Sequence, residues 1–286
     1  MPQGNRALTV TLVVTSLACA FVLAATGVAQ ANRAFATRYS ATERGSILLA
    51  GNSSLTCASS TSCTNARAGS GSSGNDEFTM TNVDVDSSSA TFNSTRAQLT
   101  LPVGATVVFA GLYWGADTSA GTDGAAAPTP ASNNRVRFTA PGASSTTLTA
   151  LVTDTDTAST TRYQGFANVT SNVQSSGSGT YTVGNIQAGT GKNRYAGWGL
   201  VVAYRLASET LRRLVVYDGY VPMSASTTPS ASVTLSDFVT PGTGTVRGRL
   251  GLLAYEGDRQ LTGESATLEN RALTYADGVV LALIGT

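Results

Sequence analysis

The chain of 286 residues contains no histidine and a single lysine, Lys192. The absence of histidine excludes Ser-His-Asp and Cys-His nucleophilic systems, histidine acid–base catalysis and histidine-ligated metals. No GxxxxGK[ST] loop is present to hold a phosphate. The sequence therefore favours a protein that is not an enzyme. A glycosidase stays open as the alternative, because it needs only two carboxylates and the chain has 17 Asp and Glu residues.

Charged residues are also scarce, at 12% of the chain, against roughly 25% in soluble domains. The 18 basic and 17 acidic residues nearly cancel. A neutral chain lacks the electrostatic footprint that nucleic acids or anionic membranes attract, so nucleic acid is not an expected partner. Uncharged polar residues must cover most of the surface, a composition typical of secreted β proteins.

The first 31 residues have the three parts of a secretory signal. Arg6 follows a short start, residues 7–25 are uncharged and rich in Leu, Val and Ala, and Ala29-x-Ala31 offers a signal peptidase two small side chains. An uncleaved anchor is the alternative, because the uncharged run approaches the roughly 20 residues that span a bilayer. The cleavage motif favours removal after Ala31. The product would then be extracellular, either released or retained at the cell surface, and would contact the membrane only through this segment before cleavage.

Cleavage would remove Cys19 and leave two cysteines, Cys57 and Cys63. In an oxidising compartment a disulfide between them is the natural interpretation. It would close a short loop, which the chain-entropy model credits with roughly 2 kcal/mol. Two thiols lack the further ligands of a closed zinc site, so metal binding by this pair is disfavoured.

Short apolar or alternating runs recur between turn residues over most of the chain. Enrichment in β-branched and aromatic residues and turns such as Pro141-Gly142 predict about eleven strands. They are expected at 78–85, 97–101, 106–114, 135–140, 147–153, 180–186, 198–205, 211–217, 232–235, 245–255 and 278–284, with 46–50 as an earlier candidate. Only 166–174 has apolar residues three and four apart, which predicts one or two helical turns. The pattern predicts an all-β fold, a jelly-roll-like β-sandwich.

The expected domain organisation follows from these segments. Residues 1–31 form the signal peptide, 32–46 a transition segment without assigned structure, and 47–286 a single β-sandwich domain. The Ala-, Gly-, Thr- and Pro-rich segment 116–134 reads as an insertion within that domain.

Two pairs of carboxylates are candidates for a calcium site. Asp84 and Asp86 are two apart on an expected strand and would share a face; Glu256 and Asp258 follow another expected strand. Calcium accepts 6–8 oxygen ligands from irregular loops, so either pair could contribute to a site. The competing interpretation is that these residues cap turns or form an ion pair with Arg259. No other cofactor is expected.

Aromatic residues stand beside glycine in several places, including Trp114 and Trp198. Aromatic surfaces with polar neighbours can stack on sugar rings. We favour a core position for both tryptophans, because each adjoins a long apolar strand and glycine permits close packing there.

Several blocks resemble the N-terminal β domain of secreted or surface-exposed, repeat-bearing bacterial proteins of actinobacterial type. The blocks are Leu55-Thr-Cys57, Thr81–Asp86, Ala90–Thr95, Leu99–Gly104, Ala110–Gly115, Tyr163–Thr170, Tyr195–Trp198 and Ala254–Arg259. The resemblance implies an extracellular β module without known catalytic activity, and it supplies no functional residues.

These observations predict a secreted, non-catalytic extracellular module with a structural or adhesive binding role at the cell surface or in the matrix. Its expected partner is a cell-surface glycan or protein. The alternatives are a secreted carboxylate-based glycan hydrolase and a carbohydrate-binding domain. A hydrolase would require two carboxylates roughly 5–10 Å apart in a cleft.

Overall fold

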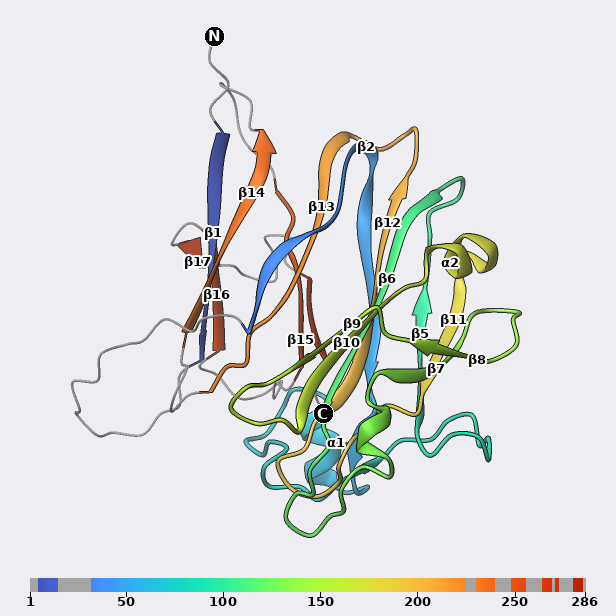
Figure 1. Cartoon of the computed structure of the whole chain (residues 1–286), viewed down its shortest axis with the longest axis vertical. Helices are drawn as coiled ribbons and strands as arrows, with labels where there is room; N and C mark the ends of the chain where they lie inside the picture. The colour runs from blue at the N-terminus through green and yellow to red at the C-terminus, as the bar shows by residue number, and fades with distance from the viewer. Residues whose placement is uncertain are drawn as a thin grey trace, which may run out of the picture. The chain divides into compact units, whose positions relative to one another are not determined.

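The structure is a computed structural model of the whole chain (Figure 1). It describes residues 5–14, 32–224, 230–239, 248–255, 264–268, 271–272 and 280–284. The chain divides into two compact units. The first comprises Met1–Thr42, Arg213–Gly251 and Thr262–Val280, and the second comprises Glu43–Arg212, Leu252–Leu261 and Leu281–Thr286. The prediction of a single domain over 47–286 stays a prediction.

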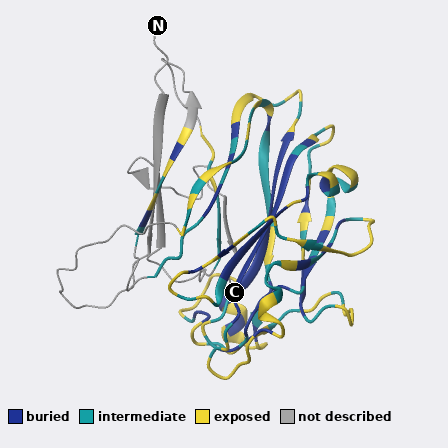
Figure 2. Cartoon of the chain, viewed as in Figure 1, coloured by how far each residue is buried: buried dark blue, intermediate teal, exposed yellow. Residues whose placement is uncertain are grey.

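The second unit contains two β-sheets. In the first sheet, part of β2 is followed in space by β12, β6, β10 and β9, all antiparallel to their neighbours. The strands are β2 (Arg33–Ser53), β12 (Ala196–Arg205), β6 (Thr106–Asp117), β10 (Arg162–Asn168) and β9 (Val152–Thr155). β6 and β12 are almost continuously apolar, and Figure 2 shows both as buried along most of their length. A run without polar alternation suits a strand that is covered on both faces.

The second sheet has the strand order β5-β11-β7-β8. Its members are β5 (Ser94–Leu99), β11 (Gly179–Gly184), β7 (Arg135–Thr139) and β8 (Thr146–Thr149). β7 reads Arg-Val-Arg-Phe-Thr, and successive side chains of a strand point to opposite faces. Val136 and Phe138 accordingly lie in the core, whereas Arg135 and Arg137 point outward.

The core lies between these two sheets. Leu112, Trp114, Trp198 and Leu200 from the first sheet belong to one hydrophobic cluster with Phe138 and further residues of the second. Trp114 and Trp198 are register partners and are fully buried. The fold is therefore an all-β sandwich, as the sequence predicts.

Two short helices and a small hairpin complete this unit. The hairpin joins β3 (Leu55–Cys57) to β4 (Met80–Asn82), and between them lies α1 (Thr61–Arg67). The hydroxyl of Ser60 caps α1 by accepting a hydrogen bond from the Cys63 backbone N–H at 3.0 Å. α2 (Thr170–Ser176) packs against β6, and a 3-10 turn, η1, spans Pro130–Ser132. Strands β15 (Gly251–Tyr255) and β18 (Val280–Ile284) pair with one another.

In the first unit, β2 runs beside β13 (Leu211–Tyr220). A separate sheet has the order β14-β1-β16-β17, formed by Ser230–Val239, Asn5–Val14, Glu264–Leu268 and Arg271–Ala272. β1 belongs to the segment that the sequence predicts to be a cleaved signal. Cleavage after Ala31 would therefore take β1 out from between β14 and β16. The signal peptide itself stays a prediction.

Some elements differ from expectation. Residues 33–46, expected to lack assigned structure, are part of β2, whose exposed and half-buried positions partly alternate. The strand expected at 78–85 is limited to β4, and the one expected at 147–153 is divided between β8 and β9. The expected helical turn exists as α2 but starts at Thr170, because Phe166 remains in β10. Within the described residues, no helix combines the length and apolar character needed to cross a membrane.

Candidate functional site

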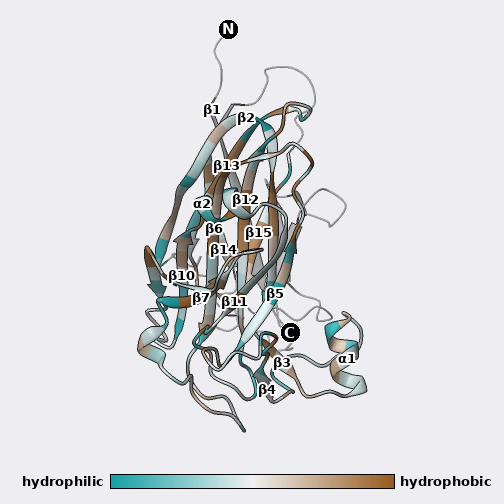
Figure 3. Cartoon of the chain, turned by 90° about the vertical axis from the view of Figure 1, so that its right-hand side faces the viewer, coloured by the Kyte–Doolittle hydropathy of each residue, from teal (hydrophilic) through white to brown (hydrophobic). Residues whose placement is uncertain are grey.

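The outward side of the β5-β11-β7-β8 sheet, here called the outer face, is polar and cationic. The register aligns Arg137 of β7 with Gly184 and Thr147, and aligns Thr182 of β11 with Thr139 and Arg96. None of the four strands contains Asp or Glu. In the view turned towards this sheet, Figure 3 shows pale and hydrophilic colours along β5. The outer face thus presents three arginines among threonines, with no acid on its strands to neutralise them.

A hollow of about 280 Å³ opens at one end of this face and is here called the β7 hollow. Its lining includes Arg135, Arg137 and Thr147 from the sheet. Outside the sheet it is lined by Phe92, Asn185 and Gln187, here called its walls, and by Thr129 and Ser132, here called its rim. No carboxylate lines it. This volume lies just below the roughly 300–1,000 Å³ typical of small-molecule sites.

Hydrogen bonds hold the walls of the β7 hollow in place. The Asn185 amide accepts from the Phe92 backbone N–H at 3.0 Å and donates to the Ala90 carbonyl at 2.9 Å. Asn185 also has a φ of 60°, a left-handed conformation that asparagine tolerates better than most residues. The Gln187 carbonyl oxygen accepts from the Thr129 backbone N–H at 2.8 Å. Three segments far apart in sequence are thus fixed around one opening.

The two arginines of β7 have no carboxylate partner among the described residues. Arg137 donates to the Thr147 hydroxyl at 3.2 Å and to the Ser145 carbonyl at 3.3 Å. Both acceptors are neutral and both distances exceed the 2.7–2.9 Å typical of charge-assisted bonds. Arg137 Nε is buried without a hydrogen-bond partner. The Arg135 side chain is exposed beside it.

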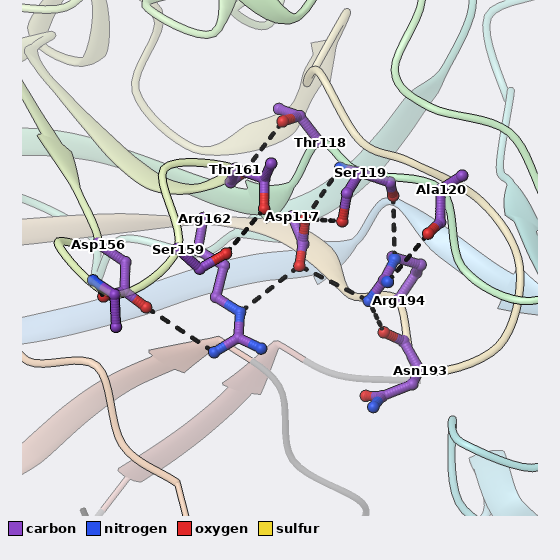
Figure 4. Close-up of polar contacts among 11 residues, drawn as sticks. Asp117, Thr118, Ser119, Ala120, Asp156, Ser159, Thr161, Arg162, Asn193 and Arg194 are labelled. Atoms are coloured by element: carbon purple, nitrogen blue, oxygen red, sulfur yellow. Dashed lines mark hydrogen bonds and ion pairs between the residues drawn. The ribbon is translucent and has the colours of Figure 1, made fainter. Parts of the chain in front are cut away.

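A buried carboxylate, Asp117, contacts Ser119 in its own loop and two arginines, Arg162 and Arg194, from distant segments (Figure 4). Its Oδ1 accepts from the Ser119 backbone N–H at 2.9 Å and from the Ser119 hydroxyl at 2.6 Å. Its Oδ2 lies 3.5 Å from Arg162 Nε and 3.6 Å from Arg194 Nη1. Burial favours the neutral acid, but the Ser119 hydrogen bonds and the charge of Arg194 outweigh it and lower the pKa of Asp117.

The same network ties two loops together. Arg194 donates to the Ser119 carbonyl at 3.0 Å and to the Ala120 carbonyl at 3.1 Å. Backbone hydrogen bonds such as Gly121 N–H to Thr190 O and Lys192 N–H to Thr122 O continue the connection. Because one loop runs on to Thr129 and the other begins near Gln187, we interpret Asp117 as a structural residue that positions the rim of the hollow.

A second buried carboxylate lies in the first unit. Asp218 accepts from Arg33 Nη1 at 2.8 Å and from Arg38 Nε at 2.6 Å. Burial opposes its charge, but the hydrogen bonds from Arg38 and Arg33 outweigh burial and lower the pKa of Asp218. With two cations satisfying it, this group has a structural role as well.

The calcium candidates Asp84 and Asp86 lie on the loop after β4 rather than on a strand. Ser87, with a φ of 53°, turns the chain there. Both residues meet Ser94: its hydroxyl donates to Asp84 Oδ1 at 2.7 Å and accepts from the Asp86 backbone N–H at 2.9 Å. Burial opposes the charge of Asp86, but hydrogen bonds from Ser88 and Thr91 lower its pKa.

Glu256 and Asp258 lie outside the described residues, so their role as calcium candidates stays a prediction. Among the described residues no group of three or more acidic or cysteine side chains is placed to hold a metal ion. A second hollow, lined by residues that include Ala140, Ser171 and Asn172, has no carboxylate either. Neither hollow therefore supplies the carboxylate pair that a glycan hydrolase needs.

The predicted disulfide is present. Cys57 and Cys63 are bonded, with Cα atoms 5.9 Å apart, and both are buried. The bond links the end of β3 to α1. The core position expected for the tryptophans is also confirmed: Trp114 Nε1 donates to the Asn133 carbonyl at 2.9 Å, and Trp198 Nε1 donates to the Thr95 hydroxyl at 2.8 Å. Neither ring is available to stack on a ligand.

Sequence reasoning identified β7 as a strand but not its arginines as a site. The signal was present, since Arg135-Val-Arg137 puts two charges on one face in a chain where charge is scarce. The Asp117 network carried no such signal, because its partners come from segments far apart in the sequence.

The fold and site define a disulfide-containing all-β sandwich with a cationic, hydroxyl-rich face. A family model described as "Protein of unknown function (DUF3344)" matches residues 64–257, more than half of the chain, so the chain belongs to this family. No curated protein and no solved structure matches it.

Proposed function

We propose that the chain is exported and serves outside the cell as a non-catalytic binding module, with an adhesive role at the cell surface or in the matrix. The observation that carries the binding role is the outer face with its preformed hollow. It combines exposed hydroxyls with arginines that lack carboxylate partners among the described residues, and hydrogen bonds hold its walls before any ligand arrives. Preformed walls reduce the ordering cost of binding.

Export is supported by the N-terminal pattern, the scarcity of charge and the disulfide, since disulfides persist mainly in oxidising compartments. The blocks quoted above also support a narrower proposal, that this module belongs to repeat-bearing surface proteins of actinobacterial type.

Expression of the full-length chain with a C-terminal tag in a secreting bacterial host tests export. We expect the tagged product in the medium with Asn32 as its first residue, by N-terminal sequencing. A product that stays in the cell and retains residues 1–31 would contradict export.

The secreted product, applied to an array of polysaccharides and to isolated cell walls, tests binding. We expect retention on at least one glycan surface without release of shorter sugars. Arg135→Gln should weaken this retention, whereas Arg205→Gln, at an exposed arginine of the opposite sheet, should leave it unchanged and controls for a general loss of positive charge. Absence of binding to every glycan and to cell walls would refute the binding role.

A further inference from the structure

We propose that the β7 hollow binds the carboxylate of an acidic sugar residue, such as a uronic acid within a polysaccharide, through Arg135 and Arg137. This inference rests on the proposed binding function and names the ligand class for the same site. It begins from the charge pattern of the sheet. Arg135 and Arg137 are two apart on one strand, so both guanidiniums arise from the same face roughly 7 Å apart along the chain.

The charge on these arginines is not neutralised locally. Arg96 adds a third cation on β5, and the four strands carry no acid. Asp86 accepts from the hydroxyl of Thr91, the residue before Phe92, and Asp84 accepts from the hydroxyl of Ser94, so both carboxylates are engaged by neutral donors outside the lining of the hollow. Because arginines but no carboxylate line the hollow, a ligand anion would meet net positive charge there.

The weak hydrogen bonds of Arg137 indicate that its guanidinium could bind a stronger acceptor. Its two terminal nitrogens make long bonds to neutral oxygens, and its Nε has no partner although it is buried. Because Nε is screened from the surface, a ligand in the hollow would contact the terminal nitrogens of Arg137. A carboxylate offers the planar pair of oxygens that matches a guanidinium, which a hydroxyl and a single carbonyl do not.

The surroundings favour a sugar over an acidic peptide. The half-buried ring of Phe92 lines the hollow, and Ser132 and Thr147 add hydroxyl groups to the same lining. Two further threonines, Thr149 and Thr182, lie on the same face of the sheet. Aromatic and hydroxyl groups around a charged centre suit a ring that carries hydroxyls and one acid group, and the volume suits one such ring.

The test compares polygalacturonate with its fully methyl-esterified form, which keeps the sugar and removes the charge. Binding of the secreted product is measured by calorimetry in EDTA, so that calcium bridges contribute nothing. We expect polygalacturonate to bind, the ester to bind at least about tenfold more weakly, and affinity to fall as salt rises. Arg135→Gln and Arg137→Gln should each weaken binding about tenfold, whereas Arg205→Gln should leave it unchanged.

Two further comparisons test whether the site binds a negative charge from another chemical group. Dextran sulfate, compared with dextran, tests a sulfate group, and polyglutamate tests an acidic peptide. Preferential binding of either over polygalacturonate would overturn the assignment to a sugar carboxylate. Equal binding of the ester and the acid, with no effect of the Arg135 and Arg137 variants, would overturn this inference and leave the binding function standing. Absence of binding to every glycan and to cell walls would overturn both. Circular dichroism of each variant establishes that it is folded.

Discussion

Replacement of Asp117 by asparagine tests whether the buried carboxylate stabilises the sandwich. The variant keeps an oxygen for the two Ser119 hydrogen bonds but places an uncharged NH₂ group opposite Arg162 and Arg194. Breaking a buried ion pair by removing one partner costs about 3–5 kcal/mol. The side chains of Arg194 and Arg162 are 17% and 40% exposed, so water compensates part of that loss.

We therefore expect the free energy of unfolding to fall by about 2–3 kcal/mol. For a unit of this size, that corresponds to a decrease in Tm of about 5–10 °C. Thermal and urea unfolding, followed by far-ultraviolet circular dichroism, measure the effect. Asp123→Asn is the matched control, because Asp123 is exposed in the same loop.

The pH dependence of this difference supplies a second readout. The folded pKa of Asp117 lies below its ordinary value of 3.8. Its contribution to stability is therefore complete above about pH 3.8 and is lost as the pH falls through the lower, folded pKa. The gap between the parent and Asp117→Asn should shrink in that acidic range. A variant that unfolds together with the Asp123→Asn control at neutral pH would refute the reasoning.

Three further predictions concern the sandwich. Gly165→Ala should destabilise by about 3 kcal/mol in urea unfolding, because the added Cβ would lie 2.4 Å from the buried Trp114 ring. Replacing Cys57 and Cys63 by serine should cost about 2 kcal/mol, and a reductant under denaturing conditions should give the same loss in the parent. Burial raises the pKa of Tyr181 from 10.0 to about 12. The stability that its neutral form contributes is present below pH 10.0 and lost as pH rises towards 12, so Tyr181→Phe should flatten the alkaline decline of Tm.

Each of these three predictions has a control or an outcome that would contradict it. Gly248→Ala meets no atom within 4 Å and should be close to neutral, so equal costs at both glycines would contradict the packing argument. A double serine variant as stable as the parent would show that the Cys57–Cys63 bond leaves stability unchanged. If tyrosinate absorbance at high pH developed identically in the folded and urea-unfolded protein, the raised pKa of Tyr181 would be wrong.

Local patterns in the sequence predicted much of the sandwich. The alternation in β7 and the apolar runs of β6 and β12 depend only on residues close together in the sequence. These strands could therefore be predicted without knowledge of the fold. The helix α1 escaped prediction, because its seven residues include only a small apolar pair, Cys63 and Ala66, that packs inward. The first half of β2 escaped because its pattern of exposure is irregular.

The candidate site was predictable only in part. Asp84 and Asp86 were proposed to share a face of a strand, and the structure instead joins them through Ser94, ten residues and eight residues further along. No local sequence pattern predicts this contact, because it depends on the turn at Ser87 and on β5 running beside the loop. The β7 hollow likewise requires Phe92 and Asn185 to be brought against one strand.

The sequence by itself determined the all-β class, the disulfide between Cys57 and Cys63, the burial of Trp114 and Trp198, and the exclusion of histidine chemistry. These follow from composition, from short-range periodicity and from which side chains avoid water. Tertiary structure alone decided which charges are neutralised. Asp117 meets Arg162 and Arg194, whereas Arg135 and Arg137 face outward on strands without an acid, because strand register brings distant segments together.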